Sequence, residues 1–229
     1  DTICGCFSVG LIPTGTADPY ALRRNAIGIL SIILDRGYAL SIPELITRSV
    51  ALLDNKRQRP AQEIEDDVVA FIRLRLVNQL AQQYPADVVD AVLSASFTAP
   101  VDALTRIKAL TMLKQRADFD LLSVAFKRVG NMIKQQPNVQ LDERLLVESS
   151  EKDLHQQLQQ VEHNVSAAIK RGDYVAALEF VAQLRKPVDA FFDDVMVMVE
   201  DVSLRNNRLA LLAAISTLFS GIADFSRLS

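Results

Sequence analysis

The stretch PAQEIEDDVVAFIRLRLVNQLAQQY, residues 60–84, decides the fold class. Its apolar residues recur at helical spacing, at Ile64, Val68, Phe71, Ile72, Leu76 and Leu80. This spacing places them along one face of a helix, so the stretch predicts a long amphipathic α-helix. Asp66 and Asp67 lie toward its start and Arg73 and Arg75 further on, an order that suits the helix dipole.

Helical patterns continue on both sides of this stretch, and no alternating strand pattern persists. Asp18 followed by Pro19 predicts the start of a helix that ends near Gly37. The first ten residues, with two glycines, predict an extended lead-in. Further helices are predicted over 41–54, 85–97, 99–116, 118–135, 148–172, 173–184, 187–197 and 203–225, with a short helical turn at 141–146. The sequence therefore predicts an all-α fold.

Composition restricts the class of function. The chain has 229 residues, of which 49% are hydrophobic, and a formal net charge of −3. This composition is typical of a globular protein, and the charge disfavours a DNA-binding protein, which usually carries a basic excess. Any contact with RNA must therefore use a local basic patch on an acidic body.

Metal binding and membrane insertion are not expected. The only cysteines are Cys4 and Cys6 and the only histidines are His155 and His163, too few for a zinc site with its usual ligand spacing. Two reduced thiols suit a cytosolic protein. The most apolar segment, residues 209–219, is too short to span a bilayer and predicts a buried helix. The chain begins at Asp1 without a signal-like segment, as expected for part of a longer polypeptide.

Two acidic pairs precede the last helix. Asp193 and Asp194 could serve as an acid and a base, but adjacent helical positions diverge and do not share a site. We therefore expect solvated carboxylates there and no catalytic residues. Glu200 and Asp201 are expected to mark a helix start, where carboxylates complement the dipole.

Basic and amide side chains follow directly. Arg205 and Arg208 are three positions apart, so they share a helix face, with Asn206 beside them. Guanidinium groups suit phosphates and stack on bases, and amides read base edges. Ion pairs with Glu200 and Asp201 explain the same arginines equally well, and the sequence leaves both readings open.

Two weaker basic groups complete the candidates for an RNA contact. Arg128, Asn131 and Lys134 fall on one helix face, although a solvated face would look the same. Arg185 and Lys186 precede Pro187 in a predicted connection, where they could meet a backbone phosphate.

Three stretches resemble a known family. They are PTGTADPYALRRNAIGIL (13–30), FKRVGNMIK (126–134), and LRKPVDAFFDDVMVM (184–198) continuing to NRLALLAAISTLF (207–219). Together they resemble the C-terminal part of bacterial glycyl-tRNA synthetase beta subunits. The third stretch, the most specific, resembles the helical anticodon-binding (DALR-type) domain shared with arginyl-tRNA synthetases.

The resemblance implies a domain organisation. Residues 1–117 would form a helical body region, with the tail of a preceding HD-type domain at 1–18, and residues 118–229 an anticodon-binding helical bundle. No His-Asp metal doublet occurs in the chain, so phosphohydrolase activity is not expected of it.

The resemblance also implies a role in a cytoplasmic glycine–tRNA ligase. A separate alpha subunit, in an α2β2 heterotetramer, would activate glycine with ATP and Mg, and this chain would bind glycine tRNA without a cofactor, membrane or DNA. The residues expected to contact tRNA are Arg128, Asn131, Lys134, Arg185, Lys186, Arg205, Asn206 and Arg208. The alternatives are a helical protein–protein scaffold without an RNA function and, less consistent with the missing metal ligands, a hydrolase.

Overall fold

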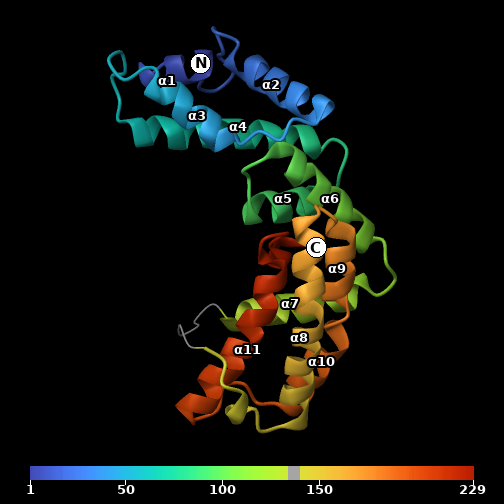
Figure 1. The fold of residues 1–229 in the computed structure, drawn as a ribbon. Helices are drawn as coiled ribbons and strands as arrows, with labels where there is room; N and C mark the ends of the chain where they lie inside the picture. Colours follow the sequence, from blue (N-terminus) through green and yellow to red (C-terminus); the bar gives the residue numbers. More distant parts are fainter. Residues whose placement is uncertain (134–139) are drawn as a thin grey trace. The chain divides into compact units, whose positions relative to one another are not determined.

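The computed structural model describes residues 1–133 and 140–229, and within these ranges all regular structure is helical (Figure 1). This confirms the prediction of an all-α fold. No helix in the described ranges is long and apolar enough to cross a membrane.

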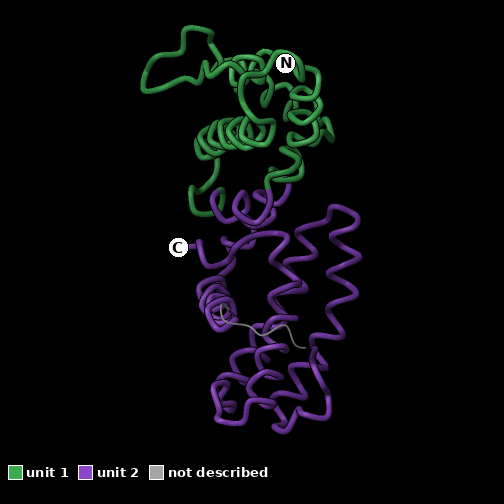
Figure 2. Tube along the Cα trace, turned by 90° about the vertical axis from the view of Figure 1, so that its left-hand side faces the viewer, with its two compact units in different colours: residues 1–89, 97–104 green, residues 90–96, 105–229 purple. Residues whose placement is uncertain are grey.

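The described chain forms two compact units (Figure 2). Unit 1 comprises residues 1–89 and 97–104, and unit 2 comprises residues 90–96 and 105–229. The chain passes between the units three times: within α5 (Ala86–Ala95), between residues 96 and 97, and within α6 (Pro100–Lys114). The predicted boundary between residues 117 and 118 separates two domains of different families, whereas this division separates compact units. The predicted boundary therefore stays a prediction.

Unit 1 is built around the helix predicted from residues 60–84. This helix, α4 (Ala61–Leu80), packs against α1 (Thr2–Ser8), α2 (Leu22–Arg36) and α3 (Ile42–Ala51) (Figure 1). The apolar face of α4 is buried at all six predicted positions, Ile64, Val68, Phe71, Ile72, Leu76 and Leu80. The periodicity therefore predicted both the helix and the side that faces the core.

The extended lead-in predicted for the first ten residues is wrong, because Thr2–Ser8 form helix α1. Ile3, Cys4 and Phe7 are buried, and the Phe7 ring lies edge-on to the Phe71 ring of α4 with 5.1 Å between centroids. Burial of this apolar face outweighs the low helix propensity of the intervening glycine.

Helix α2 begins later than predicted, at Leu22 rather than Pro19. Asp18 is nevertheless its cap: the backbone N–H of Leu22 donates to one carboxylate oxygen at 2.8 Å, and that of Arg23 to the other at 3.0 Å. Ala21 connects cap and helix in the left-handed conformation, with φ 54°. A non-glycine residue rarely adopts this conformation, so it could not be predicted from the sequence.

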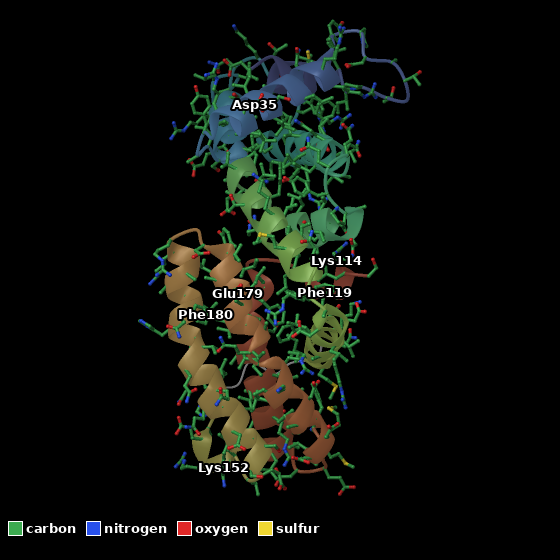
Figure 3. The ribbon with its side chains drawn as sticks, turned by 90° about the vertical axis from the view of Figure 1, so that its right-hand side faces the viewer. Asp35, Lys114, Phe119, Lys152, Glu179 and Phe180 are labelled. Atoms are coloured by element: carbon green, nitrogen blue, oxygen red, sulfur yellow. The ribbon has the colours of Figure 1, made fainter. Side chains whose placement is uncertain are left out.

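Unit 2 contains the helices α7 (Phe119–Met132), α8 (Ser149–Lys170), α9 (Tyr174–Ala182), α10 (Arg185–Asp194) and α11 (Val202–Ser220), with short 3-10 turns η2 (Glu143–Leu145) and η3 (Phe225–Arg227). The turn η2 confirms the short helical turn predicted there. The chain reverses between α8 and α9, which pack against each other as a hairpin, and Lys152 near the start of α8 lies far from Glu179 of the shorter α9 (Figure 3).

The core of unit 2 is aromatic where α7 meets α11 and η3. The rings of Phe126, Phe219 and Phe225 lie with centroids 4.9 to 5.5 Å apart. Phe191 and Phe192 of α10 are also buried and belong to this core. Residues 209–219, the most apolar segment, lie within α11 as expected of a buried helix.

Candidate nucleic-acid interface

Helix α11 begins at the acidic residue that the sequence predicted. The Asp201 carboxylate accepts hydrogen bonds from the backbone N–H groups of Ser203 at 2.8 Å and Leu204 at 3.1 Å. Asp201 is therefore an N-cap. Asp193 and Asp194, at the end of α10, are exposed.

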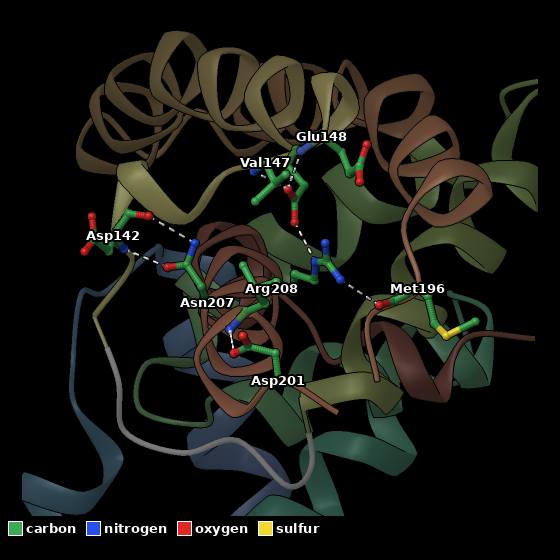
Figure 4. Close-up of polar contacts among 9 residues, drawn as sticks. Asp142, Val147, Glu148, Met196, Asp201, Asn207 and Arg208 are labelled. Carbon is green, nitrogen blue, oxygen red and sulfur yellow. Dashed lines mark hydrogen bonds and ion pairs between the residues drawn. The ribbon is translucent and has the colours of Figure 1, made fainter. Parts of the chain in front are cut away.

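Arg208 lies in the interior of unit 2 rather than on its surface (Figure 4). Its Nε donates to Glu151 at 2.6 Å and its Nη1 donates to the Met196 carbonyl at 3.0 Å. Arg208 is 6% exposed and Glu151 is fully buried. A direct contact between Arg208 and tRNA does not fit this burial, and we assign the side chain a structural role.

Glu151 explains why Arg208 is buried. One carboxylate oxygen accepts the backbone N–H groups of Val147 at 2.7 Å and Glu148 at 2.8 Å, which caps α8, and the other accepts Arg208. A buried carboxylate requires such a charged partner. Glu151 is 57 positions away from Arg208 in the sequence. The sequence therefore predicted only the nearer acids Glu200 and Asp201 as its partners.

Asn207 is a second buried anchor at the start of α11 (Figure 4). Its side-chain oxygen accepts the Asp142 N–H at 2.7 Å, and its amide nitrogen donates to the Asp142 carbonyl at 3.0 Å. Asn207 and Arg208 thus fix two neighbouring segments onto α11, one at Asp142 and one at Met196.

Arg205 and Asn206 are half-buried at the edge of the same helix. The Nη1 of Arg205 donates to the Val199 carbonyl at 2.9 Å. This acceptor is a main-chain oxygen, so the predicted ion pairs with Glu200 and Asp201 do not occupy that guanidinium nitrogen. Arg205 can still donate to a ligand through its remaining N–H groups.

The segment that Arg205 and Arg208 hold exposes large apolar side chains. We name residues 195–202 the methionine segment. Met196 is 75% exposed, Met198 57% and Val202 55%, whereas Val195 and Val197, which alternate with the methionines, are buried. The buried valines anchor the segment, and the two methionines are presented outward.

One face of α7 combines apolar and basic groups. Leu121 and Val124 are 59% and 66% exposed, and Arg128 and Asn131 follow them at helical spacing and are also exposed. We name these four residues the α7 face. The Arg128 guanidinium lies over the Phe192 ring of α10, 4.0 Å from its centroid. This contact brings the α7 face to the end of α10, where the methionine segment begins.

The remaining predicted residues are elsewhere. The prediction that Arg185 and Lys186 lie in a connection is wrong. They form the first turn of α10, where the Pro187 ring is tolerated. Arg185 pairs with Asp189 at 2.8 Å, and exposed Lys186 borders a polar groove that also includes Ser150 and Asp194. Lys134 lies outside the described residues.

The structure thus brings Arg128 to the Phe192 ring near the end of α10 and places Asn131 on the same face of α7. It leaves Arg205 half-buried beside the methionine segment and buries Arg208. Sequence reasoning missed Leu121, Val124, Met196 and Met198. Their signal is an apolar residue at a position where the helical or alternating pattern predicts the outer side. An arginine plane fixed on an aromatic ring, and exposed methionines on the segment that follows this ring in the chain, suit unstacked bases and phosphates of a single-stranded RNA loop.

Within residues 1–133 and 140–229, no three His, Cys, Asp or Glu side chains are grouped as metal ligands. Both cysteines are unpaired, and burial raises the pKa of the Cys4 thiol.

Two family models match parts of the chain. Residues 1–94 match the family described as glycyl-tRNA synthetase beta subunit, and residues 122–224 match the DALR anticodon binding domain. Similar proteins include the glycine–tRNA ligase beta subunits of Syntrophotalea carbinolica, 54% identical over 230 residues, and Citrifermentans bemidjiense, 52% identical over 229 residues. Each alignment covers 100% of this chain, which spans 33% of the relative's length. The chain belongs to the glycyl-tRNA synthetase beta subunit family, with a DALR anticodon binding domain in unit 2.

Proposed function

We propose that this chain is the tRNA-binding C-terminal part of a glycine–tRNA ligase beta subunit. Unit 2 binds the anticodon arm of glycine tRNA through the α7 face and the methionine segment. The observation that carries the proposal is Arg128, exposed on α7 and held over the Phe192 ring of α10, three residues before the methionine segment begins.

The chemistry of this surface suits a loop whose bases are turned outward. The methionines and Val124 offer polarisable and apolar area to base planes, and Arg128 offers a cationic plane and N–H donors. Such contacts tolerate a net charge of −3, because they depend on local rather than total charge.

The proposed role is to orient tRNA rather than to make or break bonds. In the family this division of labour assigns glycine, ATP and Mg to a separate alpha subunit of an α2β2 enzyme, in the cytoplasm. The described residues support it in one respect: the acidic candidates are an N-cap at Asp201 and solvated carboxylates at Asp193 and Asp194.

The test is equilibrium binding of glycine tRNA to the complete enzyme carrying Arg128→Gln. We expect the dissociation constant to rise about tenfold, since loss of a stacked or ion-paired side chain costs roughly 1–3 kcal/mol at such surfaces. The control is Arg171→Gln, which removes an exposed arginine after α8, away from the α7 face. Equal affinities of the two variants would remove Arg128 from the interface.

The alternative function, a helical protein–protein scaffold, is favoured by one observation in unit 1. A groove of about 610 Å³ there is lined by apolar side chains that include Ile29, Ile32 and Leu45, all partly exposed. Exposed apolar surface of this kind is typical of a protein contact. A chain that is only a scaffold would leave tRNA affinity unchanged in every variant of the α7 face.

A further inference from the structure

Unit 1 contains a second groove, formed by α2 and the C-terminal half of α4. Its volume is about 510 Å³, which is within the usual range for small-molecule sites. The side chains that line it include Arg23, Ile27, Leu74, Arg75, Asn78 and Gln79. It lies in a different unit from the α7 face, so a ligand of this groove does not depend on the proposed contact between the α7 face and the anticodon arm.

Two guanidinium groups share this groove. Arg75 lies over the Phe71 ring, 3.7 Å from its centroid, and its Nη1 donates to the Phe71 carbonyl at 2.9 Å. Arg23 donates to the carbonyls of Gly15 at 2.7 Å and Ala17 at 3.1 Å. Both side chains are thus held in place by neutral oxygens.

The positive charge of the groove is left without a direct counter-charge. Neither Arg23 nor Arg75 makes an ion pair with a carboxylate of the described residues, and the groove is lined by no acidic side chain of that part of the chain. Asp18, the acid nearest to Arg23 in the sequence, uses its oxygens to cap α2. Burial, and then the charge of Arg23, lower the pKa of Arg75, while Asp18 opposes them more weakly.

The groove also offers amide and apolar groups. The Gln79 Nε2 donates to the Ser31 hydroxyl at 3.2 Å, whereas its Oε1 is buried without a hydrogen-bond partner. Exchanging the two amide atoms leaves the other one unpartnered, because the hydroxyl can donate or accept. Ile27 and Leu74 are 45% and 52% exposed beside it.

We propose that the α2–α4 groove of unit 1 binds a nucleotide, with its phosphate between Arg23 and Arg75 and its base between Ile27 and Leu74. Guanidinium forks match phosphate oxygens, and apolar walls with amides accept a base plane and its polar edge. An acidic peptide could pair with the two arginines, but it has no flat base to pack between Ile27 and Leu74. The nucleotide is either one residue of an RNA chain or a free mononucleotide.

The experiment uses the complete enzyme, with glycine tRNA, uridine monophosphate and inorganic phosphate as separate probes in equilibrium binding. The test variants are Arg75→Gln and Asn78→Asp. The second keeps the size of an exposed side chain and brings a negative charge to the phosphate site without removing a contact of the fold. The control is Arg24→Gln. It removes the same charge from the residue next to Arg23, and this side chain borders the groove of about 610 Å³ instead.

For an RNA nucleotide, both test variants weaken tRNA binding about tenfold and the control does not, and the loss multiplies with that of Arg128→Gln because the sites are separate. For a free nucleotide, uridine monophosphate saturates the parent enzyme, and this binding is lost in both test variants while tRNA affinity is unchanged. The proposal is overturned if the test variants match the control with every probe. It is also overturned if inorganic phosphate binds as tightly as the nucleotide.

These outcomes are separate from those of the anticodon-arm proposal. Arg128→Gln can fail to affect tRNA binding while Arg75→Gln succeeds, or the reverse, because the two residues lie in different units. Circular dichroism of Asn78→Asp establishes that the helices persist. Asn78→Asp thus tests the groove even where Arg75→Gln disturbs the packing on Phe71.

Discussion

Arg208 connects two functions of unit 2, the stability of its core and the position of the methionine segment. Its Nε pairs with the buried carboxylate of Glu151, and its Nη1 holds the Met196 carbonyl, 2.6 and 3.0 Å away. An arginine that binds RNA and an arginine that supports the RNA-binding surface look alike in sequence. They differ in burial, and in this chain Arg128 is exposed while Arg208 is not.

We predict that Arg208→Ala lowers the free energy of unfolding by about 3–5 kcal/mol, since it leaves the Glu151 charge buried without its partner. Arg205→Ala is the matched control and should cost less than about 1 kcal/mol, because its acceptor is a carbonyl at a half-buried site. Urea denaturation measures both values. Equal losses in the two variants would contradict the structural role of Arg208.

At the residue scale, short-range chemistry was predictable and long-range pairing was not. The helix start at Asp201 follows from neighbours within a few residues. The Glu151–Arg208 pair and the Asn207–Asp142 hydrogen bonds join residues 57 and 65 positions apart. One sequence contains no signal that selects these partners among all acids and main-chain groups.

The elements themselves follow from periodicity and from caps. The turn between α8 and α9 is an example: Gly172 has φ 72°, its N–H donates to the Ile169 carbonyl at 2.9 Å, and the Asp173 N–H donates to the Ala168 carbonyl at 3.0 Å. This pair of hydrogen bonds is a Schellman motif, whose left-handed position favours glycine. The sequence predicted the end of this helix at residue 172.

We predict that Gly172→Ala lowers the free energy of unfolding by about 1 kcal/mol, because alanine is strained at this positive φ. Gly130→Ala provides the opposite control. Gly130 lies within α7, and an added Cβ there meets no atom within 4 Å, so alanine should stabilise the helix by up to about 1 kcal/mol. Thermal unfolding of both variants checks the signs, and a shift in the same direction would refute this description of the turn.

Elements were missed where tertiary burial or an unusual backbone decided the outcome. Helix α1 forms because Ile3, Cys4 and Phe7 are buried against unit 1, despite a glycine in its centre. Helix α2 starts at Leu22 because Ala21 adopts a left-handed conformation. Neither propensity nor turn composition encodes these two facts.

At the scale of the whole molecule, an acidic protein presents local cationic sites. The formal net charge is −3, yet Arg128 of unit 2 and the pair Arg23 and Arg75 of unit 1 are not neutralised by ion pairs with the described carboxylates. Because these arginines lie in different compact units, the two proposed sites can be tested separately. The α7 face could be predicted only in part, because Arg128 and Asn131 were apparent from spacing but their apolar neighbours were not.

We predict that the affinity of the enzyme for glycine tRNA falls steeply as the salt concentration rises, in spite of the negative net charge. Phosphate contacts release counterions, so the logarithm of the association constant decreases linearly with the logarithm of the salt concentration. Titrations from about 50 to 200 mM salt measure the slope. A slope near zero would favour the scaffold over an RNA-binding role.

The most direct measurement is photo-crosslinking of glycine tRNA that carries 4-thiouridine in its anticodon loop, bound to the complete enzyme, with the crosslinked peptides identified by mass spectrometry. We predict crosslinks to residues 121–131 of α7 and to the methionine segment at 195–202. Crosslinks confined to the α8–α9 hairpin or to unit 1 would contradict the assignment of the anticodon arm to this surface.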